Sequence, residues 1–184
     1  VIPYAPPSGK DLARGLFEAA QTDPSLADVS LQAALALLES QACLVGAGDC
    51  IRAEQLLNVV LTQSPSEPSS LLLMGQVLLR RGDAAGAFER LGQLSGDIAE
   101  SGLTFALRAL AGAQADKASE AVKLAQRAES AAPNDPNVKA LLARALWTMG
   151  ERDQARTLAR AALARGEAPA AGDGLAGLRA RVLA

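Results

Sequence analysis

Apolar and small side chains recur at helical spacing in the middle of the chain. Between residues 71 and 78 they follow one another at intervals of three, one and three residues, which places them on one face of an α-helix. An Arg-Gly-Asp turn at 81–83 comes next, where glycine permits the positive φ that commonly ends a helix. The spacing then resumes, so the pattern predicts a second helix packed antiparallel on the first. The two stripes are Leu71, Met74, Gly75 and Leu78, then Ala87, Leu91 and Leu94.

The same pattern returns every 34 residues. Turn residues stand at this spacing, and an alanine follows each of them five positions later. Repeats of this kind cannot bury their apolar faces alone, whereas stacked neighbours form a continuous core. The turn residues are Gly48, Gly82, Asp116 and Gly150, and the alanines are Ala53, Ala87, Ala121 and Ala155. We therefore predict four helix pairs in one phase, at residues 34–67, 68–101, 102–135 and 136–169.

The segments outside the four units predict a partial unit and a cap. Residues 11–33 contain apolar positions at the spacing of a second helix and are interpreted as a partial repeat helix and its connection. Residues 1–10, with three prolines, predict an extended segment. Residues 170–184 predict a short C-terminal helix that caps the last unit.

With these residues in place the chain resembles the tetratricopeptide repeat family over most of its length. The family is recognised by a small residue in the first helix, an alanine in the second and a closing proline. Here Gly75, Ala87 and Pro65 stand in those places. The third unit departs, with Arg108 where a leucine is usual and Asp116 in place of the turn glycine. The resemblance implies an all-α fold, a right-handed superhelical solenoid of antiparallel helix pairs.

Composition favours a helical chain without catalytic chemistry. Hydrophobic residues make up 49% of the 184 residues but aromatic ones only 3%, and alanine and leucine are strong helix formers. The chain has no histidine, which removes the commonest general base and the commonest metal ligand. The formal net charge of −2 gives no broad basic surface for nucleic acid, and no apolar run is long enough for a membrane span. We expect no enzyme activity, cofactor, metal or nucleic-acid partner.

Two cysteines, Cys43 and Cys50, are candidates for a disulfide. The repeat places them late in one helix and early in the next, on opposite sides of the Gly48 turn. Such antiparallel positions can come within the separation that a disulfide allows, whereas the alternative is a pair of buried thiols. A disulfide indicates an oxidising compartment. We therefore expect a bacterial periplasmic or outer-membrane-associated protein, with the cytoplasm as the alternative.

The first residue of the chain and its amino-acid composition are consistent with an envelope protein, by analogy. The chain begins at Val1, which is consistent with a removed signal peptide and equally with a domain cut from a longer protein. Together with the cysteine pair and the alanine- and arginine-rich composition, this makes the chain similar to envelope repeat lipoproteins that assist pilus, secretion or outer-membrane assembly.

The family resemblance implies a concave groove lined by the first helix of each unit. Soluble proteins avoid large exposed apolar patches, and the implied lining is apolar, so we expect a partner peptide or amphipathic helix to fill it. Trp147 is the expected hot spot if it faces outward; otherwise it packs beneath the C-terminal cap. The implied lining is Leu35, Leu38, Val45, Leu72, Gln76, Leu79, Leu103, Leu110, Arg144 and Trp147.

The sequence therefore favours a non-catalytic scaffold that recognises a protein or peptide. Some repeat proteins of this family clamp acidic chaperone tails with lysine and asparagine in the first unit and with lysine and arginine in the third. Here Leu38, Ala42, Leu103 and Leu107 stand at those places. Two alternatives remain open. In one, the groove is filled by self-association in a structural subunit. In the other, the chain is the regulatory domain of a larger enzyme.

Overall fold

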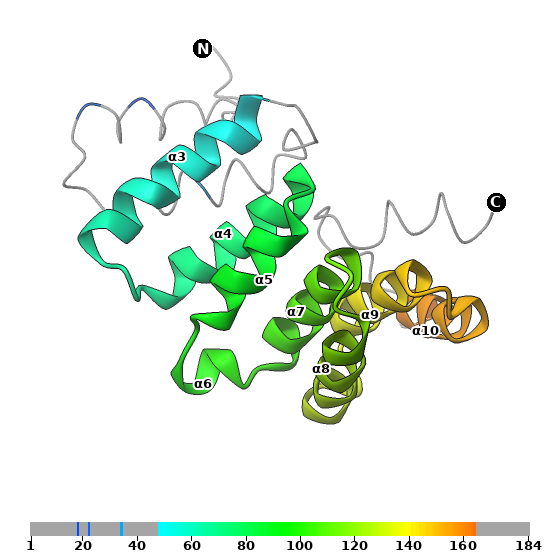
Figure 1. Cartoon of the computed structure of the whole chain (residues 1–184). Coiled ribbons are helices and arrows are strands. Elements are labelled where there is room, and N and C mark those ends of the chain that lie inside the picture. The colour runs from blue at the N-terminus through cyan, green and yellow to red at the C-terminus, as the bar shows by residue number, and fades with distance from the viewer. Residues whose placement is uncertain (1–17, 19–21, 23–33, 35–47, 165–184) are drawn as a thin grey trace, which may run out of the picture.

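The computed structural model describes residues 18, 22, 34 and 48–164. Within this part of the chain all regular secondary structure is α-helical, so the expected all-α fold class is confirmed. The helices, labelled as in Figure 1, are α3 (Gly48–Gln63), α4 (Pro68–Arg81), α5 (Ala84–Gly92), α6 (Gly96–Ala99), α7 (Gly102–Gln114), α8 (Ala118–Ala131), α9 (Pro136–Thr148) and α10 (Arg152–Ala164).

Helix starts in the described part keep the 34-residue spacing of the sequence. The helices α4, α7 and α9 begin at residues 68, 102 and 136, and each is followed across a short turn by α5, α8 or α10. The pairs stack one after another, from α3 in cyan to α10 in orange in Figure 1. The predicted extended segment, partial repeat and C-terminal cap lie outside the described residues, apart from the isolated positions 18 and 22.

A continuous apolar core joins the pairs. One cluster of buried side chains runs from α3 to α9, and a smaller cluster of alanines joins α9 to α10. The helices α4 and α5 approach closely at Gly75, where an added Cβ would collide with Cγ and Cδ2 of Leu91. Leu91 is fully buried, and a close-packed interior leaves it no room to retreat. The small residue at position 75 therefore sets the separation of the two helices.

Residues in the left-handed region end the first helix of each described pair. Gly82 has a φ of 84° and Gly150 a φ of 89°. Asp116 adopts a φ of 57° in the corresponding turn of the third unit. Aspartate enters this region more readily than most residues with a side chain. The exchange of the turn glycine for Asp116 therefore keeps the backbone turn.

The second helix of unit 68–101 is shorter than its apolar spacing predicts. The sequence places Leu94 on this helix, but α5 ends at Gly92 and Leu94 is buried beyond it. Glycine is a poor helix former, and Gly96 adopts a φ of 67°, which the interior of a helix cannot accommodate and which here stands at the first residue of α6. Gly92 and Gly96 therefore interrupt the helix, and the single turn α6 follows. The prediction of burial for Leu94 is confirmed, but its placement on the helix is wrong.

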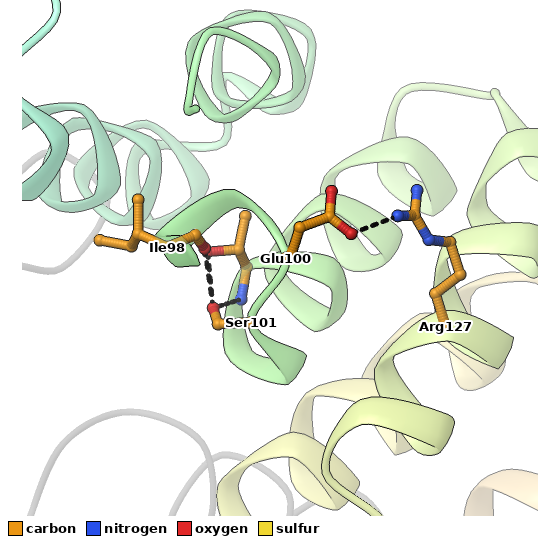
Figure 2. A network of polar contacts seen from close by, with 5 residues as sticks. Ile98, Glu100, Ser101 and Arg127 are labelled. Carbon is orange, nitrogen blue, oxygen red and sulfur yellow. Dashed lines mark hydrogen bonds and ion pairs between the residues drawn. The ribbon is translucent and has the colours of Figure 1, made fainter. Parts of the chain in front are cut away.

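A polar network closes this interruption and begins α7. The Ser101 hydroxyl oxygen accepts a hydrogen bond from the Thr104 backbone N–H at 3.2 Å and donates one to the Ile98 carbonyl at 2.9 Å (Figure 2). The buried Thr104 hydroxyl donates to the same carbonyl at 2.7 Å. Beside them, the Glu100 carboxylate pairs with the Arg127 guanidinium of α8 at 2.7 Å (Figure 2). The network ties the connection to both helices of the next unit.

The start of α4 is capped by a carboxylate. The backbone N–H groups of Ser69 and Ser70 donate to the Glu67 side chain. Burial raises the pKa of Glu67, but the hydrogen bonds from Ser70 and Ser69 outweigh this effect and hold the pKa below its ordinary value of 4.5. Because the folded-state pKa is depressed, the ionised carboxylate stabilises the fold at neutral pH. This contribution is lost as the pH falls through the lowered pKa.

We predict that Glu67→Gln lowers the free energy of unfolding by about 0.5–1 kcal/mol at neutral pH, because it removes the charge at the helix start. Urea unfolding of both proteins at about pH 7 and about pH 3 measures the effect. The difference should shrink as the pH falls, because protonation of the native carboxyl removes the same charge. A difference of equal size at both values would show that the charge is not responsible.

Candidate partner-binding surface

The first helices of three consecutive units, α4, α7 and α9, pack side by side. On α4, Leu72, Gln76 and Leu79 follow one another at intervals of four and three residues, so they share one face. All three are half-buried, and the two leucines rest against the core. This face of α4 therefore presents partly exposed apolar surface around one amide.

The two predicted lining residues of α7 lie in different surroundings. Leu103, in the first turn, is 36% exposed. Leu110 is only 1% exposed and belongs to the core, because α7 packs against α4, α5, α8 and α9. Leu110 therefore offers no surface to a partner in this structure, contrary to the expectation from its position in the repeat.

The helix α9 contributes Arg144 and Trp147, both half-buried. The guanidinium of Arg152 lies 3.9 Å from the centroid of the Trp147 ring. Arg152 begins α10, so one face of the indole is covered from within its own unit by a cation–π contact. The alternative packing of Trp147 beneath the C-terminal cap concerns residues outside the described part.

Arg80 is a charged residue of this region that the sequence analysis misses. It follows Gln76 by four residues and therefore lies beside it on α4. Burial, and to a lesser degree the positive charge of Arg144, lowers the pKa of Arg80 from its ordinary value to about 10. The two guanidinium groups are therefore close enough to repel each other, although α4 and α9 belong to the second and fourth units. The sequence does contain a signal for Arg80, because it stands four residues after Gln76. That spacing points to the binding face only once Gln76 has been assigned to the groove lining.

Most of the predicted residues of the first unit lie outside the part of the chain that the structure describes. Leu35, Leu38, Val45 and Cys43 lie outside the described residues. Cys50 lies in the first turn of α3 and is fully buried. The pairing of the two cysteines stays a prediction.

A second cationic cluster surrounds Phe88, away from the predicted lining. The Lys117 ammonium lies 4.3 Å and the Arg108 guanidinium 5.5 Å from its ring centroid. Burial lowers the pKa of Arg108, as does the nearby charge of Arg127, while Glu120 and Glu100 act in the opposite direction. The Arg108 Nε is buried without a hydrogen-bond partner in the described part of the chain. The guanidinium of Arg108 therefore lies partly buried near the Phe88 ring, with Glu120 and Glu100 as nearby opposite charges.

Within the described ranges, no group of three or more histidine, cysteine or acidic side chains is arranged to hold a metal ion. Among the helices that the structure describes, none has the length and apolarity that crossing a membrane requires.

Comparisons with known proteins find one matching family model and similar solved structures. Residues 113–178 match the family model of the tetratricopeptide repeat. Among solved structures, the chain is similar to the one titled "Crystal structure of MamA", with a TM-score of 0.63 and 13% sequence identity over 88% of this chain and 96% of that chain. No curated protein matches the chain. The tetratricopeptide-repeat resemblance and fold expected from the sequence are therefore confirmed.

Proposed function

We propose that this chain is a non-catalytic scaffold that binds another polypeptide along α4, α7 and α9. The observation that carries the proposal is the partly exposed apolar surface of Leu72, Leu79 and Leu103 on consecutive first helices. The tetratricopeptide-repeat fold supports a protein–protein interaction scaffold in general. An amphipathic helix or extended peptide that covers these side chains would remove apolar area from water, which drives association.

Charge near these leucines narrows the chemistry of the partner. Arg80, which follows Leu79 on α4, and Arg144 of α9 bring two positive charges near each other. A segment that carries a carboxylate between apolar residues would complement them, because a guanidinium binds a carboxylate through paired hydrogen bonds. We therefore propose a partner segment with apolar anchors and at least one acidic residue.

We predict that Leu72→Glu with Leu79→Glu reduces capture of the partner from a native lysate by at least about tenfold, since two buried carboxylates oppose binding by well over 1.4 kcal/mol. The bait is the full chain, and quantitative mass spectrometry compares the captured proteins. Circular dichroism first establishes that the variant retains its helices.

The matched control is Ile51→Glu with Gln55→Glu, which adds the same charge to two exposed positions of α3. This control should capture the same protein as the native chain. The proposal would be contradicted if the Leu72→Glu, Leu79→Glu chain captured the same partner as strongly as the native chain does. If size-exclusion chromatography shows that the only occupant lost is a second copy of the chain, the scaffold acts through self-association instead.

We further propose that the protein works in an oxidising compartment such as the bacterial envelope, with Cys43 bonded to Cys50. Cys50 is fully buried, and the described part of the chain contains no free cysteine, which supports the pairing. A role in envelope assembly would suit a scaffold that grips peptide segments. A disulfide closing so short a loop stabilises by roughly 2–3 kcal/mol on the chain-entropy account.

We expect the denatured chain to take up no alkylating reagent at Cys43 or Cys50 unless it is first treated with a reductant. Intact-mass spectrometry of protein secreted to the periplasm of an expression host measures this directly. Two adducts per chain before reduction would rule out the disulfide and remove the support for an oxidising compartment.

A further inference from the structure

A hollow of about 440 Å³ lies between α8, α9 and α10. Four residues of α8 line it at positions i, i+3, i+4 and i+7, so they form a single helical stripe. The stripe is Val122, Ala125, Gln126 and Glu129. Val122 is 44% exposed, one of three large hydrophobic side chains so exposed among the described residues. This face of α8 is therefore apolar at its centre and open to solvent.

The hollow lies on the opposite side of α9 from the proposed binding face. Leu142 and Leu146 form its floor on α9. Leu146 follows Arg144 by two residues, which is a rotation of about 200° around a helix. Leu158 of α10 completes the apolar lining. A ligand in this hollow would therefore contact side chains that the proposed binding face does not use.

The rim of the hollow is acidic. Glu129 and Asp153 are its charged lining residues, and neither lysine nor arginine is among the ten residues that line it. Arg156 lies beside the rim and its Nη1 is 3.5 Å from an Asp153 oxygen. Both side chains of this pair are well exposed to water, so the pair is weak and an incoming cation competes with it. The electrostatic complement of this rim is a positive charge.

We propose that this hollow is a second docking site, for a partner segment that inserts an apolar side chain flanked by lysine or arginine. The hollow is open to solvent on one side, which suits a side chain presented by a partner segment. A side chain on a partner helix needs only the half-buried Leu146 and Leu158, which lie beside the buried Leu142. The basic flanks would face Glu129 and Asp153. The site goes beyond the proposed function, because both its face and its charge preference differ.

The test uses a displayed library of random peptides of about 16 residues, long enough for about four helical turns. The library is selected on the full native chain and counterselected on Val122→Lys with Gln126→Lys. Both positions are exposed, so these exchanges neutralise the charge of the lining and cover its apolar centre at little expected cost to folding. Enriched peptides should combine leucine or a similar residue with neighbouring arginine or lysine.

Fluorescence anisotropy of one enriched peptide then measures its affinity. We expect at least about tenfold weaker binding to the Val122 and Gln126 variant, which corresponds to about 1.4 kcal/mol. Binding should weaken with added salt and remain unchanged in the Leu72→Glu, Leu79→Glu chain. The proposal would be overturned if the enriched peptides were acidic or if no peptide were enriched. It would also be overturned if the peptide failed to bind only the Leu72→Glu, Leu79→Glu chain. Only the last of these would leave the proposed function supported.

Discussion

Replacing Gly75 by valine is expected to lower the free energy of unfolding by about 3 kcal/mol, near the top of the usual range for an overpacked core. A Cβ at this position would collide with Cγ and Cδ2 of Leu91, and Cδ1 lies only 3.0 Å away. Valine adds two further methyl groups on a branched carbon. Since Leu91 is fully buried, the strain falls on the separation of α4 and α5.

Gly92→Ala is the matched control for this exchange. An added Cβ at Gly92 meets only Nη2 of Arg108, at 3.7 Å, which is ordinary contact. Alanine is also the better helix former, so we expect a change of no more than about 1 kcal/mol, in the stabilising direction. Guanidinium unfolding followed by far-ultraviolet circular dichroism gives both values. Equal destabilisation by the two exchanges would show that the close approach at Gly75 is not the cause.

Replacing Phe88 by alanine is expected to destabilise the chain by about 3–4 kcal/mol, the usual cost of removing a buried aromatic ring. Phe88 joins two units: it belongs to α5, and its Cε2 would be 3.2 Å from a Cβ added at Gly112 of α7. Its ring also accepts the cations of Lys117 and Arg108. Truncation would therefore leave a cavity and remove the aromatic support of two partly buried charges.

The control Phe88→Leu retains most of the apolar volume and removes only the ring. We expect it to cost about 1–1.5 kcal/mol, with the difference between the two exchanges measuring the cavity. Thermal unfolding and chemical unfolding should rank the three proteins in the same order. A cost below about 1 kcal/mol for Phe88→Ala would mean that α5 and α7 are held together by other contacts.

The helical framework of the described units could be predicted from the sequence because its signals are local. The turn residues Gly82 and Gly150, and the small residue Gly75, each act through their own backbone or their nearest helix neighbour. Even Asp116 could be placed, since position in the repeat identified its turn before the structure gave its left-handed backbone. The fixed period strengthens every such signal, because the same turn and small residues recur at the same positions of each unit.

Features that depend on neighbouring units could not be predicted in this way. Leu103 and Leu110 have similar roles in the repeat, yet only the packing of α7 among its neighbouring helices decides that Leu110 is buried. Arg80 and Arg144 stand 64 positions apart, and no local pattern brings them together. The early end of α5 had a local signal in Gly92 and Gly96, but the apolar spacing through Leu94 outweighed it.

The shortened α5 has a consequence for how the array comes apart. In a stacked array each unit touches only its neighbours, so stability is approximately a sum of unit and interface contributions. The junction at α5 rests on a nine-residue helix, whereas α8 and α10 have 14 and 13 residues. We expect force or mild denaturant to open the array first at this junction, between residues 48–92 and 102–164. Gly92 and Gly96, which shorten α5, thus set the place where we expect the solenoid to yield first under load.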